Sequence, residues 1–304
     1  MSTMDPTRPE GVMRVAYGGQ GVVQREDGER LPCRFRRSVG RPCCGDRVRL
    51  ERAGADDWVV AEILPRRNEF VRGDGRQRRQ VIACNLDQVL VVIAPEPRPS
   101  RDLVERYLVA VHSLGMQPVL VINKAELLDA SAGLTDTAQS PPFSRVAEYR
   151  RLGYTVVHTS TRAAPGTDAL APLLHGSTSI LVGQSGVGKS SLVNRLIPDL
   201  DLQTGELSRA TGKGTHTTTT TILYELPDGG ALIDSPGVWE YGLWAMSARE
   251  LAAGFPEFWP YVGQCRFNDC RHHGEPGCAV DAAMGEGAIP EWRLSAYRRL
   301  LEQA

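Results

Sequence analysis

The chain has 304 residues, 41% of them hydrophobic, and a net charge of −1 from 35 basic and 36 acidic side chains. This composition is ordinary for a globular protein and excludes wholly disordered, collagen-like and coiled-coil chains. The most apolar run, residues 89–94, is far shorter than the roughly 20 residues of a membrane-spanning helix, so no membrane association is expected. Residues 1–11 are polar and lack the apolar core of a secretory signal, which predicts a cytoplasmic location and seven cysteines that are free thiols or metal ligands.

Basic residues are concentrated near the N-terminus. Residues 1–84 hold 17 Arg against 12 acidic residues, a net charge of +5, and six of these Arg lie within residues 66–79. A locally basic segment favours contact with a polyanion such as RNA. A solvated Arg-rich loop without a ligand is the alternative.

Lysine is rare, with three Lys against 32 Arg. Lysine is a compact charge on a flexible stem, whereas arginine is a planar fork, so sites that retain Lys in such a chain need a reason. The three positions are Lys124, Lys189 and Lys213. All three fall inside the candidate nucleotide motifs described below.

The N-terminal part, residues 1–85, contains short alternating segments separated by Gly, Asp and Pro. About five short strands at roughly ten-residue spacing predict a small closed antiparallel barrel. With a basic loop beside it, an OB-fold that binds RNA is the preferred interpretation, and a generic five-stranded sheet is the alternative. Its four cysteines have irregular spacing and are expected to be buried thiols: Cys33, Cys43, Cys44 and Cys84.

Residues 86–240 alternate apolar strands with amphipathic helices, which are expected over 101–114, 145–152 and 189–196. This alternation predicts a multidomain α/β protein whose central domain is a mostly parallel sheet covered on both faces. Residues 241–304 are richer in helical and Cys/His-bearing segments and end in a helix expected over 291–303. They predict a third, small helical module.

Residues 183–190 read GQSGVGKS, which matches G-x-x-x-x-G-K-[ST] between an apolar strand and a helix. Glycines let backbone amides approach phosphate oxygens, Lys189 reaches the β- and γ-phosphates, and Ser190 offers a hydroxyl to Mg²⁺. A chance glycine-rich turn is the alternative. The match predicts a phosphate-binding loop with these nucleotide-binding residues: Gly183, Gln184, Ser185, Gly186, Val187, Gly188, Lys189, Ser190 and Ser191.

A second phosphate element is DSPG at residues 234–237, 45 residues after Lys189. Asp234 at the tip of a strand is suited to holding Mg²⁺ through water, and Gly237 can offer its amide to a γ-phosphate. Between them lies GTHTTTTT, whose residues 217–219 include a candidate hydroxyl for Mg²⁺, assigned here to Thr218. A β-turn and a Thr-rich strand edge are the alternatives for these two segments.

Residues 123–126 read NKAE and follow an apolar strand, which resembles the N-K-x-D element of GTPases. In that element the Asn reads the purine, the Lys stem packs on the base, and the acid accepts protons that only guanine presents. Asn123, Lys124 and Glu126 are therefore predicted to bind the base, although Glu is one methylene longer than the usual Asp. Thr159 and Ser160, after another strand, fit the short loop that backs the base.

The order of these elements is unusual. Asn123 precedes Lys189 by 66 residues, whereas ordinary GTPases carry the phosphate loop first. This order predicts a circular permutation, which a parallel sheet tolerates because its strands are held by neighbours and not by sequence order. The Asp234 loop then leads directly into the C-terminal module.

The C-terminal module contains Cys265, Cys270, His272 and Cys278 in C-x4-C-x-H-x5-C spacing. Three thiolates and one imidazole within 14 residues predict one closed, tetrahedral, structural zinc site. His273 is the rival ligand. Reduced thiols without metal are the alternative, disfavoured because free Cys prefers apolar surroundings and this stretch is polar.

Together these motifs resemble the circularly permuted, ribosome-associated GTPases of the RsgA/YjeQ family. The resemblance covers essentially the whole chain and includes GDRVRL at residues 45–50 and QVIACNLDQVLVVIA at residues 80–94. It implies an OB-fold, a permuted GTPase domain and a zinc module. It also implies a GTP hydrolase that binds 16S rRNA during late maturation or quality control of the 30S ribosomal subunit, with Mg²⁺ as cofactor of GTP. The sequence gives no sign of oligomerisation, so a monomer is expected.

The resemblance bears on how the attacking water is held. Many small GTPases carry Gln directly after D-x-x-G, but Val238 stands at that position here and cannot orient water. His216 is the family's candidate and is expected to act with Lys189 in catalysis. A structural or RNA-contacting role for His216, and a phosphate or rRNA contact for Lys213, remain open.

Two other functions are left as alternatives. An RNA-binding barrel and zinc protein with a degenerate nucleotide site is suggested by Glu126 and Val238, but the intact phosphate loop opposes it. An NTPase that serves metal insertion is suggested by the Cys/His cluster. The closed spacing of that cluster leaves no open coordination position for metal transfer.

Overall fold

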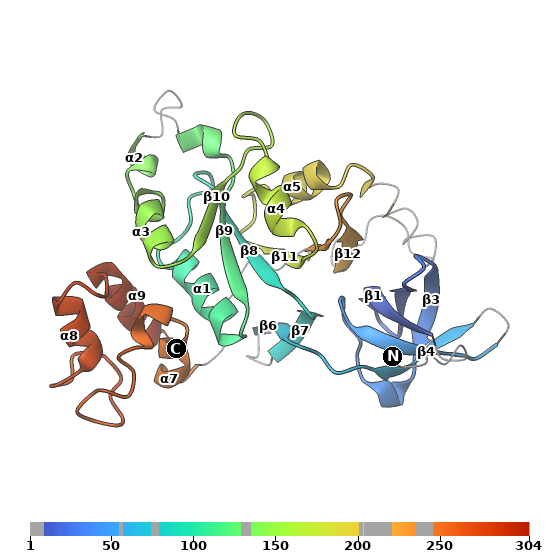
Figure 1. The fold of residues 1–304 in the computed structure, drawn as a ribbon, viewed down its shortest axis with the longest axis horizontal. Coiled ribbons are helices and arrows are strands. Elements are labelled where there is room, and N and C mark those ends of the chain that lie inside the picture. The colour runs from blue at the N-terminus through green and yellow to red at the C-terminus, as the bar shows by residue number, and fades with distance from the viewer. Residues whose placement is uncertain are drawn as a thin grey trace.

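A computed structural model of the chain describes residues 9–54, 57–73, 79–128, 135–200, 203, 221–234 and 246–303. In Figure 1 a β-barrel lies at one end, an α/β domain in the middle, and a helical module at the other end. The predicted multidomain α/β architecture is thus confirmed. None of the described helices is long and apolar enough to cross a membrane.

The N-terminal barrel is built from five strands in the order β1-β2-β3-β5-β4, and β1 also pairs with β4 to close it. It differs from the predicted antiparallel barrel in one pair, because β3 and β5 run parallel. A short 3₁₀ turn, η1 (Arg37–Val39), precedes β4. Alternate side chains point inward and form one apolar cluster, as expected for half-buried strands. The strands are β1 (Glu10–Tyr17), β2 (Gln20–Gln24), β3 (Arg30–Phe35), β4 (Arg47–Arg52) and β5 (Trp58–Ile63).

The Arg-rich stretch after the barrel differs from its prediction as a basic loop. Residues on both sides of it form an antiparallel hairpin, β6 (Glu69–Gly73) and β7 (Arg79–Cys84). Phe70 and Val71 are consecutive and both buried, at a register shift of the hairpin, so β6 lacks the apolar–polar alternation by which a strand is predicted. The hairpin connects the barrel to the central domain.

The central sheet has the order β10-β9-β8-β11-β13-β12, in which only β12 runs antiparallel to its neighbour within this part. This confirms the mostly parallel sheet. The strands are β8 (Gln88–Ile93), β9 (Gln117–Ile122), β10 (Thr155–His158), β11 (Thr178–Val182), β12 (Ile222–Glu225) and β13 (Ala231–Asp234).

Helices cover both faces of the central sheet. Val89 and Val91 of β8 belong to the core that includes α1 and α3, whereas Leu90 and Val92 belong to the core that includes α4 and α5. This two-residue alternation explains why the strands read as continuous apolar runs. The helical segments are α1 (Leu103–Ser113), η2 (Ala125–Leu128), α2 (Thr135–Ala138), η4 (Phe143–Arg145), α3 (Val146–Arg151), η5 (Asp168–Leu170), α4 (Ala171–Leu174) and α5 (Lys189–Leu196).

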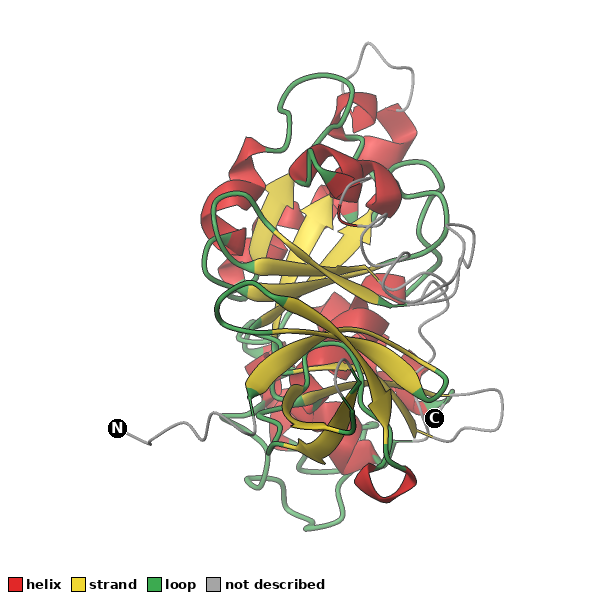
Figure 2. Cartoon of the chain, turned by 90° about the vertical axis from the view of Figure 1, so that its right-hand side faces the viewer, coloured by secondary structure: helices red, strands yellow, loops and turns green. Residues whose placement is uncertain are grey.

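The barrel and the central sheet are continuous. Val15 of β1 pairs antiparallel with Ile222 of β12, so that one eleven-stranded sheet runs through both domains. Figure 2, viewed from the barrel side, shows the barrel strands in front of the central sheet. The sequence did not predict this junction, which joins residues more than two hundred positions apart.

The C-terminal module packs closely on α1. A Cβ atom on Gly254 would lie 2.6 Å from a methyl carbon of Val109, so only glycine permits this approach. Helix α7 begins with a capping box between Ser247 and Glu250. The elements are α7 (Ala248–Ala253), η6 (Pro256–Phe258), α8 (Ala279–Gly285) and α9 (Glu291–Leu301).

Two arginines of α9 also hold this module to the central domain. Arg293 is fully buried and donates a hydrogen bond to the Tyr154 hydroxyl of the central domain at 3.2 Å, while its ion pair with Glu257 stays within the module. Arg299 binds both carboxylate oxygens of Asp102, at 2.7 and 2.6 Å. Because a buried charge that loses a partner is costly, the bonds from Arg293 to Tyr154 and from Arg299 to Asp102 fix the module's orientation.

His112 of α1 lies at the same junction, and burial, followed by the charge of Arg293, lowers its pKa from 6.5 to about 4. The unfolded chain therefore binds one more proton than the folded chain between these pH values. We expect stability to fall as the pH drops from 6.5 to 4, by at most about 1.4 kcal/mol per pH unit from this group.

His112→Phe removes the titrating group and keeps a ring against Tyr154, whose centroid lies 5.6 Å from that of His112. The Nε2 atom of His112 is buried with no hydrogen-bond partner among the described residues. The replacement therefore breaks no hydrogen bond of that atom. Urea unfolding at several pH values should show a flatter acid slope for His112→Phe than for wild type. Parallel slopes would contradict this assignment.

Candidate nucleotide-binding site and metal centre

The predicted phosphate loop, residues 183–190, connects the carboxyl end of β11 to the start of α5. Gly183 and Gly188 have φ angles of +147° and +93°, in the region that favours glycine. A Cβ on Gly183 would lie 2.2 Å from the carbonyl oxygen of Val92, and one on Gly188 would lie 2.4 Å from Nδ2 of Asn123. The neighbouring strands therefore require glycine at both positions.

Lys189 folds back over this loop. Its ammonium donates hydrogen bonds to the carbonyl oxygens of Gly183 at 2.7 Å and Gln184 at 3.0 Å. Burial lowers the pKa of Lys189, and the nearby charge of Asp234 at the tip of β13 opposes this shift. Lys189 and Asp234, the predicted magnesium ligand, are therefore close enough for their charges to interact.

Several predicted loop residues are open to solvent. Ser185, Ser190 and Ser191 are exposed, whereas Val187 is buried in the core between the loop and the sheet. Gln184 donates from Nε2 to the carbonyl oxygen of Pro97 at 2.8 Å. The hydroxyls are therefore available to a ligand above the first turn of α5.

Asn123 and Lys124 join the two permuted motifs directly. Asn123 is 1% exposed and donates from Nδ2 to the carbonyl oxygen of Val187 at 2.9 Å. Lys124, with a positive φ of 55°, donates from Nζ to the carbonyl oxygens of Gly186 at 2.8 Å and Glu96 at 2.7 Å. Residues 123–124 thus contact the phosphate loop although they precede it in the sequence.

The other predicted base-reading residues lie at the same sheet edge. Thr159 donates from its hydroxyl to Oδ1 of Asn123 at 3.1 Å, and its carbonyl oxygen accepts the amide of Ala125 at 3.0 Å. The Ser160 hydroxyl accepts the backbone amide of Ala163 at 2.9 Å and is committed to the local turn. These bonds fix the segment that backs the Asn123 side chain.

Glu126, on η2, has a buried Oε2 atom with no hydrogen-bond partner among the described residues. Burying an unpaired carboxylate oxygen is costly, so this atom is suited to accept a donor supplied by a ligand. The remaining predicted residues lie outside the described part of the chain: Lys213, His216, residues 217–219 including Thr218, Gly237 and Val238.

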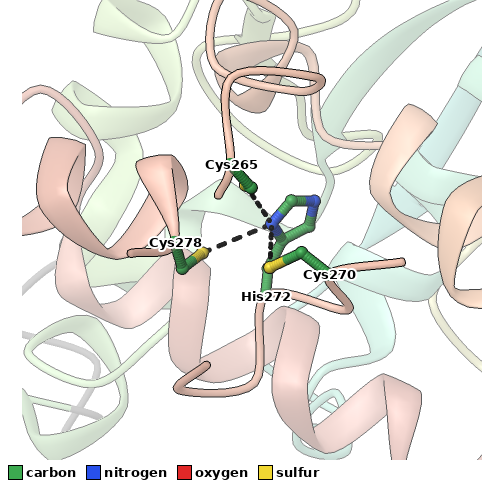
Figure 3. A group of neighbouring side chains, drawn as sticks. All are labelled: Cys265, Cys270, His272 and Cys278. Atoms are coloured by element: carbon green, nitrogen blue, oxygen red, sulfur yellow. Dashed lines mark hydrogen bonds between the residues drawn. The ribbon is translucent and has the colours of Figure 1, made fainter. Parts of the chain in front are cut away.

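The predicted metal cluster assembles in the C-terminal module. The Nδ1 atom of His272 lies 3.6 Å from the sulfur of Cys265, 3.7 Å from that of Cys270 and 3.4 Å from that of Cys278, as Figure 3 shows. All four ligand atoms lie within 4.8 Å of one another. Tetrahedral zinc with bonds of about 2.3 Å to sulfur and 2.0–2.1 Å to nitrogen requires S···N separations of about 3.6 Å. The cluster therefore fits a zinc ion.

The surroundings of the cluster distinguish the two adjacent histidines. His272 is 5% exposed and adopts a positive φ of 58°, which aims its ring at the three sulfurs. His273 instead faces solvent, and its Nε2 atom lies 3.7 Å from Glu302. The amide of Ala279 donates to the Cys265 sulfur at 3.4 Å, an interaction that stabilises a thiolate.

A second group of potential ligands lies between the barrel and the hairpin and was not predicted. The carboxylate of buried Asp46 accepts four donors: Arg66 Nε at 2.7 Å, Arg66 Nη2 at 2.8 Å, the Cys43 amide at 2.7 Å and the Cys84 thiol at 3.1 Å. These occupy its roughly four lone-pair positions. The group is therefore a hydrogen-bonded contact between barrel and hairpin, and the four cysteines of residues 1–85 are buried as expected.

Comparisons with known proteins agree with this geometry. A sequence model described as RsgA GTPase matches residues 63–244. The small ribosomal subunit biogenesis GTPase RsgA of Azotobacter vinelandii is 42% identical over 96% of this chain and 84% of its own length, and that of Chromohalobacter salexigens is 44% identical over 97% and 86%.

Two solved structures resemble the fold over nearly its whole length. YjeQ from Thermotoga maritima has a TM-score of 0.75 and 29% identity, covering 97% of this chain and 98% of its own. YloQ, described as a circularly permuted GTPase, has a TM-score of 0.72 and 28% identity, covering 99% and 97%. The motifs, their permuted order and these similarities together establish that the chain belongs to the RsgA GTPase family.

Proposed function

We propose that this protein is a Mg²⁺-dependent GTP hydrolase that acts in maturation of the small ribosomal subunit. The observation that carries the proposal is the contact of Asn123 with Val187, which brings the permuted base-reading element against the phosphate loop. A nucleotide bound there would meet both elements at once. The names of the curated relatives supply the ribosomal context.

In this proposal Glu126 selects guanine. Its carboxylate, whose buried Oε2 has no partner among the described residues, accepts the N1 and N2 protons that only guanine presents, while Lys124 packs along the base. Asn123 and Thr159 hold the purine edge, and Ser160 keeps their segment in place. Adenine lacks these protons and would leave the carboxylate of Glu126 without a donor, which makes ATP a poor substrate.

The phosphates lie on the loop amides at the N-terminus of α5, with Lys189 released from Gly183 and Gln184 to reach them. Ser190, Asp234 and Thr218 are the proposed magnesium ligands, and the Gly237 amide is the proposed γ-phosphate contact. Magnesium supplies neutralisation of the developing phosphate charge.

Hydrolysis by the isolated protein should be slow. Val238 offers no hydrogen bond to the attacking water, so His216 is the proposed residue that positions it. Docking on the small subunit is proposed to complete this arrangement, and conversion to GDP then favours release.

The partners follow from the charge and the modules. The barrel, with the excess of Arg in residues 1–84, is proposed to bind 16S rRNA, and the protein is proposed to act as a monomer in the cytoplasm, where small subunits mature. The cluster of Cys265, Cys270, His272 and Cys278 is proposed to hold one structural zinc ion.

Nucleotide selection tests the proposed site with the isolated protein. Wild type should hydrolyse GTP in strong preference to ATP, and Glu126→Gln should lose at least about tenfold of that preference, because the neutral amide presents the guanine donors with a weaker and partly mismatched partner. Glu126→Asp is the matched control, since it keeps the acid that GTPases ordinarily use. Equal rates with GTP and ATP for wild type would contradict the proposal.

A further inference from the structure

Arg14 lies at the junction of the barrel with the central sheet and is only 2% exposed. Its guanidinium donates from Nε to the carbonyl oxygen of Leu223 at 2.6 Å, from Nη1 to Oε1 of Gln24 at 2.6 Å, and from Nη2 to Oε1 of Gln203 at 3.2 Å. Its Nη1 also lies 3.4 Å from the carboxylate of Glu225. One side chain of β1 therefore contacts β2 of the barrel and β12 of the central sheet.

These contacts bracket the Thr-rich segment. Gln203 and Thr221 are the described residues on either side of residues 204–220. Gln203 accepts the amide of Glu225 at 3.2 Å and donates to its carbonyl oxygen at 3.2 Å. The thiol of Cys44, in the barrel, donates to the carbonyl oxygen of Thr221 at 3.0 Å. Barrel side chains therefore hold the chain before and after this segment.

Strand pairing also connects this junction to Asp234, the proposed magnesium ligand. Val15, the neighbour of Arg14, pairs with Ile222, and Ile222 pairs in turn with Asp234 of β13. A single row of residues thus connects the barrel to the tip of the strand that bears Asp234. Ile222 is the one residue between Val15 and Asp234 in this row. A movement of β1 relative to β12 would therefore displace Asp234.

From these contacts we propose that Arg14 is a positioning residue that couples the barrel to the hydrolytic site, so that docking of the barrel on RNA sets the geometry around Asp234, Gln203 and Thr221. This inference rests on the proposed ribosome-stimulated GTP hydrolysis. Arg14 touches no proposed ligand of the nucleotide, and its action is through Leu223, Gln203 and the β1–β12 pairing.

The chemistry of Arg14 suits a rigid connection. Its acceptors come from three separate segments, and loss of the guanidinium removes this donor from the buried carbonyl oxygen of Leu223 and from the two glutamine side chains. Burial lowers its pKa to about 10, so it keeps its charge throughout the neutral range of an assay. Lysine has a single donor group and cannot span the same acceptors.

The test compares GTP hydrolysis of wild type and Arg14→Met with and without purified small ribosomal subunits. We expect the basal rate and the GTP affinity to stay within about twofold of wild type, and the maximal subunit-stimulated rate to fall at least about tenfold, while the affinity for the subunit is nearly unchanged. A purely structural role would alter stability without this separation of stimulated rate from subunit affinity. Full stimulation of folded Arg14→Met would overturn the inference.

Two further variants make the result decisive. Gln203→Met removes one acceptor of Arg14 and should reduce stimulation, adding nothing to Arg14→Met in the double variant; it also decides the question if Arg14→Met does not fold. Arg30→Met is the matched control, because Arg30 is also a barrel arginine and its guanidinium lies 3.6 Å from the same carboxylate of Glu225. It should keep stimulation. A wild type that the subunit does not stimulate would instead refute the proposed function itself.

Discussion

His272→Ala is expected to release zinc and to destabilise the C-terminal module, because the Nδ1 atom of His272 is the point to which all three sulfurs converge. Structural zinc contributes roughly 10–16 kcal/mol to small domains, so one of four ligands represents about 2.5–4 kcal/mol if they share it equally. Zinc content after dialysis against a chelator, followed by thermal unfolding, measures both effects.

His273→Ala is the matched control, since the two histidines are adjacent and only one faces the sulfurs. His273 is half-exposed and its Nε2 atom lies 3.7 Å from Glu302, a surface contact of small energetic value. This variant should retain about one zinc per chain and the wild-type unfolding temperature. Retention of zinc by His272→Ala together with its loss from His273→Ala would show that the ligand has been assigned to the wrong residue.

Gly188→Ala is expected to weaken GTP binding by at least about 100-fold, or about 2.8 kcal/mol. The new methyl group would sit 2.4 Å from Nδ2 of Asn123, so the loop must shift away from the base-reading element. The φ angle of +93° adds strain for any L-residue. Titration with a fluorescent GTP analogue measures the loss.

Gly115→Ala separates strain from the loss of the site. Gly115 also has a positive φ, +70°, but a Cβ there meets nothing within 4 Å, and the residue lies in the turn between α1 and β9. Both variants should lose about 1–2 kcal/mol of stability from the strained backbone, and only Gly188→Ala should lose GTP. Equal GTP affinity in the two variants would refute the close packing of Gly188 on Asn123.

Much of the site could be predicted because its chemistry is encoded in short segments. The spacing of Cys265 to Cys278 places four ligands within one loop, and the phosphate loop lies between a strand and a helix that follow one another. The meeting of Asn123 with Val187 was also predictable, since both follow strands of one parallel sheet and such strands end at the same edge.

The contacts that join the domains could not be predicted. Arg14 and Leu223 are separated by 209 positions, and Arg293 and Tyr154 by 139. Nothing local marks Arg14 among the 17 Arg of residues 1–84, because its burial depends on how the barrel meets β12. The Arg-rich surroundings likewise hid the β6–β7 hairpin, where tertiary packing of Phe70 and Val71 outweighs the local charge.

This chain is proposed to be a GTP hydrolase that the small ribosomal subunit activates. The most direct measurement is the rate of phosphate release from GTP by wild type and Lys189→Ala, alone and with purified 30S or 50S subunits. We expect a slow basal rate that 30S subunits raise at least about tenfold and 50S subunits do not, with no activity in Lys189→Ala. A wild-type rate that is the same with and without 30S subunits would contradict it.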